Sequence, residues 1–119
     1  MLNKVIMMGR LTKEVEIRYT KNNTPVASFS LAVERNYSKG KEKETDFFDV
    51  IAWKSTAEFA SKYFSKGQLV CVEGRLQRRQ WTDDDKKTRY AVEVIADSVY
   101  FAGYNKNAEQ GFDPFEEAA

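Results

Sequence analysis

The chain has no histidine and a single cysteine, Cys71, among its 119 residues. Histidine is the commonest general base and metal ligand, and one cysteine forms neither an internal disulfide nor a thiolate metal site. The surroundings of Gly67 and Gly74 lack the spacing of a phosphate-binding loop. Three aspartates at 83–85 precede a lysine and are typical of a solvated turn. We therefore expect no enzyme activity, no metal and no cofactor.

Long apolar runs are also missing. No run approaches the roughly 20 residues that span a membrane, and the start lacks the apolar core of a signal peptide. We therefore expect a soluble, cytoplasmic protein.

A strong charge of one sign is absent too, since the net charge is only +1. The charge is uneven, however. The last 16 residues hold one lysine and four acids, a balance of −3, which leaves +4 on residues 1–103. A mildly basic body with an acidic end predicts one folded domain at 1–103 and a disordered acidic tail at 104–119.

Alternation of apolar and polar residues predicts strands along most of the body. The first continues in strand-like alternation through Glu14–Tyr19, before a turn at residues 21–24. The predicted strands are Asn3–Leu11, Pro25–Arg35, Thr45–Trp53, Gln68–Trp81 and Thr88–Phe101.

One helix is predicted after the third of these strands. Ser55 to Glu58 has the pattern of a capping box, apolar residues follow at helical spacing, and Gly67 is placed to close the helix as a left-handed cap. An all-β chain of five strands with one short helix between strands three and four predicts the OB-fold, a five-stranded oligonucleotide/oligosaccharide-binding barrel.

The segment Thr45–Trp53 is apolar on both of its predicted faces. Val50 and Ala52 share one face, while Phe47 and Trp53 share the other. A strand of a one-core domain normally exposes one face to water. Either this strand is buried on both sides, or its large rings form a surface that stacks flat ligands.

Large rings occur beside basic residues at three places in the chain, which favours the second interpretation. Rings stack on bases of any sequence, and arginine or lysine meets the phosphates of single-stranded nucleic acid. Any one such site could instead be a ring closing the end of a barrel. The predicted stacking residues are Tyr37, Phe47, Trp53 and Trp81, and the predicted phosphate contacts are Arg10, Arg35, Lys54, Arg75, Arg78 and Arg79.

The tail carries a pattern of its own. Phe112, Asp113, Pro114 and Phe115 place two rings among acids in a segment that cannot bury a core. This composition predicts a short linear peptide that binds a partner protein.

Several segments together resemble the single-stranded DNA-binding proteins of bacteria and their phages. The resemblance runs from Asn3 to Phe101 and is carried by Asn3–Leu11, Pro25–Val33, Thr45–Lys54 and Val72–Leu76. It implies an OB-fold that assembles as a homotetramer with single-stranded DNA wrapped over it during replication, recombination and repair. The family's stacking positions fall on Tyr37, Phe47, Trp53 and Trp81.

The resemblance also implies that the acidic tail docks replication and repair proteins. In the family this peptide ends on Pro-Phe, whereas here Phe115 is followed by four more residues. The short link between body and tail is similar to that of phage or mobile-element members. The alternative function is an OB-fold protein-interaction or RNA-binding module, such as a primosome component.

Overall fold

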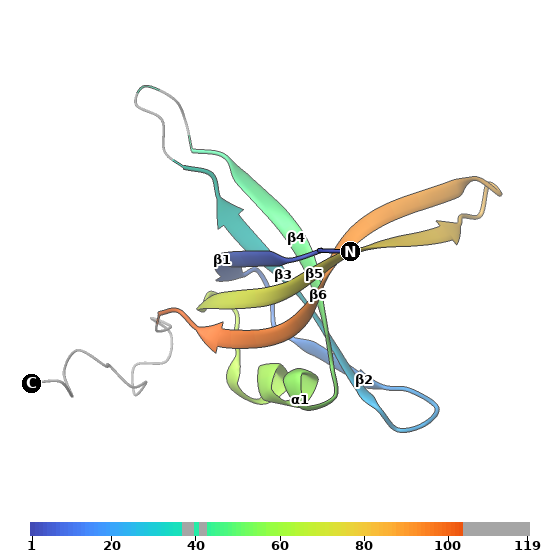
Figure 1. Ribbon diagram of the computed structural model, residues 1–119, viewed down its shortest axis with the longest axis horizontal. Helices are drawn as coiled ribbons and strands as arrows, with labels where there is room; N and C mark the ends of the chain where they lie inside the picture. Colours follow the sequence, from blue (N-terminus) through green and yellow to red (C-terminus); the bar gives the residue numbers. More distant parts are fainter. Residues whose placement is uncertain (37–39, 41–42, 104–119) are drawn as a thin grey trace, which may run out of the picture.

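The computed structural model describes residues 1–36, 40 and 43–103. In this part of the chain it contains six strands and one helix (Figure 1). They are β1 (Val5–Leu11), β2 (Glu16–Tyr19), β3 (Pro25–Glu34), β4 (Thr45–Trp53), α1 (Lys54–Tyr63), β5 (Leu69–Thr82) and β6 (Thr88–Phe101).

Five of the strands pair in a closed ring. β1 pairs with β5, β5 with β6, β6 with β4 and β4 with β3, and β3 returns to β1 at Arg10 and Leu11. The β4–β6 pair is parallel and the others are antiparallel. This confirms the predicted fold class, with one difference in counting. Glu16–Tyr19 forms β2, a separate strand paired with β3, so the helix lies between the fourth and fifth strands.

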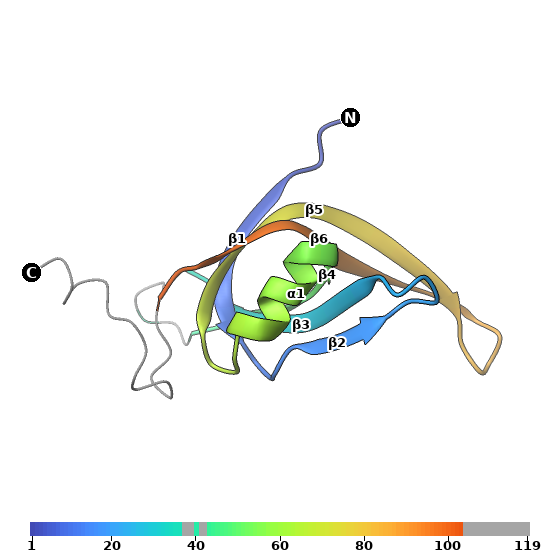
Figure 2. The same cartoon turned by 90° about the horizontal axis from the view of Figure 1, so that it is seen from below.

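The core fills the ring and extends to the helix at one end. Leu31, Val50 and Val72 are fully buried inside the ring, and Ala57 and Ala60 of α1 pack into the same cluster. Figure 2 shows α1 lying across the end of the ring. No helix in the described part of the chain is long and apolar enough to cross a membrane.

The predicted helix ends are both wrong. The helix begins at Lys54 directly after β4, and no side chain caps it, because Ser55 and Thr56 lie inside its first turn. It ends at Tyr63, since Phe64 adopts an extended conformation and is buried in the core. Gly67 does have a left-handed backbone, with φ of 85°, but it lies in the following turn.

A bulge divides β5 and β6 into two parts. Glu73 pairs with Ser98 and Gly74 with Ala96, which leaves Asp97 unpaired. A Cβ on Gly74 would lie 1.9 Å from the Ile95 carbonyl oxygen, so only glycine fits there. Beyond the bulge the two strands form a hairpin that extends away from the ring (Figure 1), and we call residues 75–93 the hairpin arm.

Candidate nucleic-acid interface

The two apolar faces of β4 differ in their exposure to solvent. Val50 and Ala52 are completely buried, whereas Phe47 is 67% exposed and Trp53 is 44% exposed. Odd-numbered residues of β4 therefore point outward from the ring. Single exposed apolar residues are common on proteins, whereas a group of large exposed side chains on one surface marks a binding site.

Arg10 lies on the same outward face as Phe47. Arg10 of β1 is opposite Ala32 of β3, and Ala32 is opposite Phe47 of β4. Directly opposed residues share a face of the sheet. The Arg10 guanidinium also donates a hydrogen bond of 3.1 Å to the Gly67 carbonyl, which holds its side chain toward the turn after the helix.

A second row of paired residues connects the outward face of β4 with one side of the hairpin arm. Ser28 is opposite Ile51, Ile51 is beside Ile95, and Ile95 is opposite Arg75. Because side chains alternate along a strand, Arg79 and Trp81 share the face of Arg75. We call the part of the outward surface that carries Phe47, Trp53, Trp81, Arg10, Arg75 and Arg79 the ring face.

Trp81 lies on the side of the hairpin arm that belongs to the ring face, and the Arg79 guanidinium lies over its indole. It is 38% exposed, and the Arg79 guanidinium lies 4.5 Å from its ring centroid. Arg79 also pairs with Glu93 at 3.3 Å, and Arg75 pairs with Asp97 at 3.8 Å. Phosphates would compete with these carboxylates for the same guanidinium groups.

Arg78 lies on the opposite side of the arm from Trp81. Its guanidinium is 3.7 Å from the ring centroid of Tyr90, which is 51% exposed. Tyr90 was missing from the sequence prediction. The sequence did hold a signal, since Arg89 directly precedes Tyr90, but the guanidinium that lies over the ring belongs to Arg78 of the other strand.

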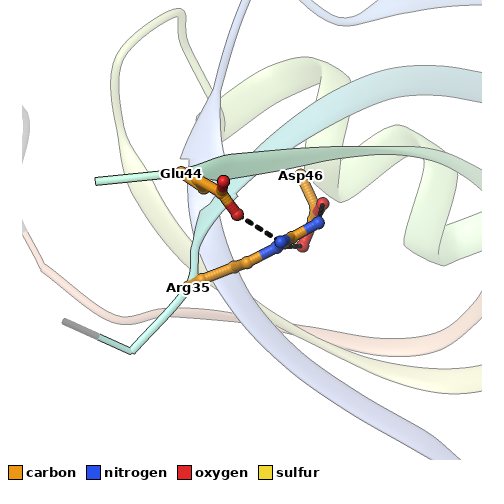
Figure 3. Close-up of polar contacts among 3 residues, drawn as sticks. All are labelled: Arg35, Glu44 and Asp46. Atoms are coloured by element: carbon orange, nitrogen blue, oxygen red, sulfur yellow. Dashed lines mark hydrogen bonds and ion pairs between the residues drawn. The ribbon is translucent and has the colours of Figure 1, made fainter. Parts of the chain in front are cut away.

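The Arg35 guanidinium forms ion pairs with two acidic side chains, those of Asp46 and Glu44 (Figure 3). It donates to both carboxylate oxygens of Asp46 at 3.0 Å and to Glu44. The hydrogen bond from Arg35 is the largest cause that lowers the pKa of Asp46 below its ordinary value. The pair joins the end of β3 to the start of β4 at the base of the connecting loop. To contact a phosphate, Arg35 would have to exchange one of these partners.

Lys54 is exposed at the junction of β4 and α1, next to Trp53. Its φ of 56° is left-handed, which turns the chain sharply out of the strand. Tyr37 and the tail residues Phe112, Asp113, Pro114 and Phe115 lie outside the described residues.

The three aspartates of the arm tip make a turn. The Asp83 carboxylate accepts hydrogen bonds from the backbone N–H groups of Asp85 and Lys87 and from Arg89. These bonds lower its pKa, the largest cause being Arg89. No group of three metal-ligating side chains occurs among the described residues.

Comparison with known proteins agrees with this geometry. The model of the single-strand binding protein family matches residues 2–102. The single-stranded DNA-binding protein of Caldanaerobacter subterraneus subsp. tengcongensis is 43% identical over 98% of this chain and 79% of its own length. That of Clostridium tetani is 42% identical over 97% of this chain and 82% of its own.

A solved structure is similar as well. The Plasmodium falciparum SSB in complex with ssDNA superimposes with a TM-score of 0.78 at 26% sequence identity. The match covers 85% of this chain and 95% of that one.

Proposed function

The chain belongs to the single-strand binding protein family, and from that membership we propose that it binds and protects single-stranded DNA without sequence preference. The observation that carries the proposal is the ring face. Phe47, Trp53 and Trp81 are exposed on one side of a continuous sheet, with Arg10, Arg75 and Arg79 among them. We propose that this occurs in the cytoplasm, in replication, recombination and repair.

The ring face supports this function through two physical terms. Each base that stacks on a ring contributes about 1–3 kcal/mol whatever its identity, because every base has a π-face. Each phosphate that meets an arginine or lysine releases counterions, which adds affinity that is independent of sequence. We assign stacking to Tyr37, Phe47, Trp53 and Trp81. We assign phosphate contacts to Arg10, Arg35, Lys54, Arg75, Arg78 and Arg79.

A fluorescence titration with oligo-dT tests the proposal. Trp53 and Trp81 are the only tryptophans, so base stacking should quench the protein's emission until the site is full. Oligo-rU in the same buffer measures the preference for DNA over RNA. Unchanged emission with both polymers would identify a protein-interaction module and refute the proposal.

We also propose that the protein assembles as a homotetramer. Ile6 and Met8 of β1 are exposed apolar residues. Met8 is opposite Cys71 of β5, and Cys71 is opposite Tyr100 of β6, whose ring is exposed as well. An exposed apolar row of this kind marks a contact with another protein surface, which we propose is a second copy of the chain. The number of four copies comes from the family resemblance. Light scattering at micromolar concentration should give four chain masses, and a single chain mass would refute assembly.

The acidic segment 104–119, which lies outside the described residues, is proposed to dock replication and repair proteins. The rings of Phe112 and Phe115 would enter apolar pockets while the acids meet a basic rim. A chain ending at Gly103 should lose capture of such partners. It should bind oligo-dT somewhat more tightly at low salt, because a charge of −3 has been removed. Weaker DNA binding at low salt would show that the segment belongs to the DNA site.

A further inference from the structure

The hairpin arm has two exposed sides, and the ring face uses only one. The arm reaches away from the ring of strands (Figure 1), and within the described part of the chain most of its residues beyond the bulge are exposed. The register of β5 and β6 sets which residues share the second side. We call it the back of the arm, and it carries Leu76, Arg78, Gln80, Tyr90 and Val92.

The back of the arm repeats the ring-plus-cation arrangement of the front. On the front, Arg79 lies over Trp81 at 4.5 Å, and on the back, Arg78 lies over Tyr90 at 3.7 Å. Half of the Tyr90 side chain remains exposed. No other aromatic ring of the described residues contacts it, so one guanidinium covers the ring and the rest is open to a base.

The charges on the two sides differ in a way that favours DNA on the back. Arg75 and Arg79 on the front are each paired with a carboxylate. Arg78 is the one arginine of β5 with no carboxylate partner within residues 1–36, 40 and 43–103. A phosphate can therefore approach Arg78 without displacing an acid.

We propose that Tyr90 is a further base-stacking residue, with Arg78 as its phosphate contact, so that the hairpin arm binds single-stranded DNA on both of its sides. This inference rests on the proposed function and adds a second contact surface to it. DNA that follows the front of the arm past Trp81 reaches the turn at residues 83–87 and can continue onto the back.

A second copy of the chain is the competing occupant, because Leu76 and Val92 are also exposed there. Charge argues against it. The only ionised side chain on the back is Arg78, so two backs meeting around a two-fold axis would bring like charges together with no acid to pair them. An anionic polymer faces no such repulsion.

The test is a titration of the full chain and of Tyr90→Leu with long oligo-dT, read by the emission of Trp53 and Trp81. Tyr90→Leu keeps apolar bulk but removes the ring, and we expect its affinity to fall about fivefold or more. Tyr90→Phe keeps the ring and should match the parent. Val92→Ala, a change of apolar area on the same side, should also match it.

The outcomes separate this inference from the proposed function. If the parent binds and Tyr90→Leu binds equally well, the back of the arm is not a DNA site and only the inference fails. If the parent shows no quenching at all, the proposed function fails first. If Tyr90→Leu or Val92→Ala lowers the molar mass in light scattering without DNA, the back is a contact between copies and the inference is overturned.

A direct readout does not depend on the affinity of one variant. In a chain carrying Trp53→Phe and Trp81→Phe, the substitution Tyr90→Trp makes position 90 the only tryptophan. Oligo-dT should quench its emission, since a stacked base lies against the indole. Emission that stays constant at saturation would overturn the inference.

Discussion

The exposed aromatic rings and the arginines around them differ in what each must give up within the protein to bind DNA. Trp53 is 44% exposed and Trp81 is 38% exposed although Arg79 lies over its ring, so part of each ring is open to a base without displacing an acid. The arginines are mostly engaged already, with Arg35, Arg75 and Arg79 each paired to at least one acid. Stacking should therefore dominate the contribution of individual residues to affinity, and phosphate contacts should add less than a count of arginines suggests.

Replacing Trp53 or Trp81 by alanine should cost about 1–3 kcal/mol of single-strand affinity. Both side chains project outward, so the fold should survive and the melting temperature should stay close to that of the parent. Each variant keeps one tryptophan as its fluorescent reporter, and the titration is made with oligo-dT. If Trp53→Ala binds as tightly as the parent, its ring serves the fold and not the DNA.

The contribution of the Arg35–Asp46 pair to the stability of the fold should decrease in acid and stay constant near neutral pH. The pKa of Asp46 lies below its ordinary value of about 4 in the folded chain. The pair therefore stabilises the fold above that value, and the contribution is lost as the pH falls through the lowered pKa. The chain has no histidine to titrate between about pH 5 and 7.

Melting curves of the parent and Asp46→Asn check this expectation. The difference in melting temperature should be constant between about pH 5 and 7 and should shrink in acid, as the parent's carboxylate is protonated. A difference that grows on acidification would assign the pair a destabilising role.

At the scale of elements, β5 serves two purposes. Its first half, with Val70 and Val72 fully buried, closes the ring, and its second half is exposed along its whole length as one strand of the hairpin arm. The change of role occurs at Gly74, where the bulge shifts the register against β6. A strand that continued without the bulge would present a different set of residues to each side of the arm.

Gly74→Ala should destabilise the fold by about 1–3 kcal/mol, because the added methyl would meet the Ile95 backbone. Urea unfolding measures the loss. Gly103→Ala is the matched control, since its methyl would meet only the Leu69 side chain, at 3.2 Å, which can move. Equal losses in the two variants would show that the close approach at the bulge is relaxed at little cost.

At the scale of the whole molecule, affinity and selectivity for single strands depend on the sum of small contacts over one extended surface. Residues 1–103 carry a net charge of +4. The basic residues of the ring face lie on β1 and β5, and Lys54 lies at the β4–α1 junction. A polymer of evenly spaced phosphates can meet several of them at once, whereas a small anion meets one.

Binding should weaken with salt in proportion to the number of phosphates that the protein neutralises. For single strands the slope of log K against log salt is about −0.7 per phosphate. Titrations of the parent and Lys54→Gln at several salt concentrations should show a slope smaller in magnitude for the variant. A response to salt that is flat for both would point to an uncharged partner.

The sequence by itself determined the fold class and which rings share a face of β4, whereas the structure showed that this face is exposed. Side chains alternate strictly along a strand, so Phe47 and Trp53 had to lie opposite to Val50 and Ala52 wherever β4 was placed. The order of strands and helix was readable for the same reason, since each element carries its own period. These are properties of neighbours along the chain.

Only the tertiary structure decided which charges are engaged and where the elements end. Arg79 pairs with Glu93, and Arg78 lies over Tyr90. Both partners belong to β6, and the bulge at Gly74 sets the register of β6 against β5. The helix ended early because the core required Phe64, which no local cap signal encodes. Contacts between segments distant in sequence depend on how backbones approach one another, and a one-dimensional pattern does not contain that distance.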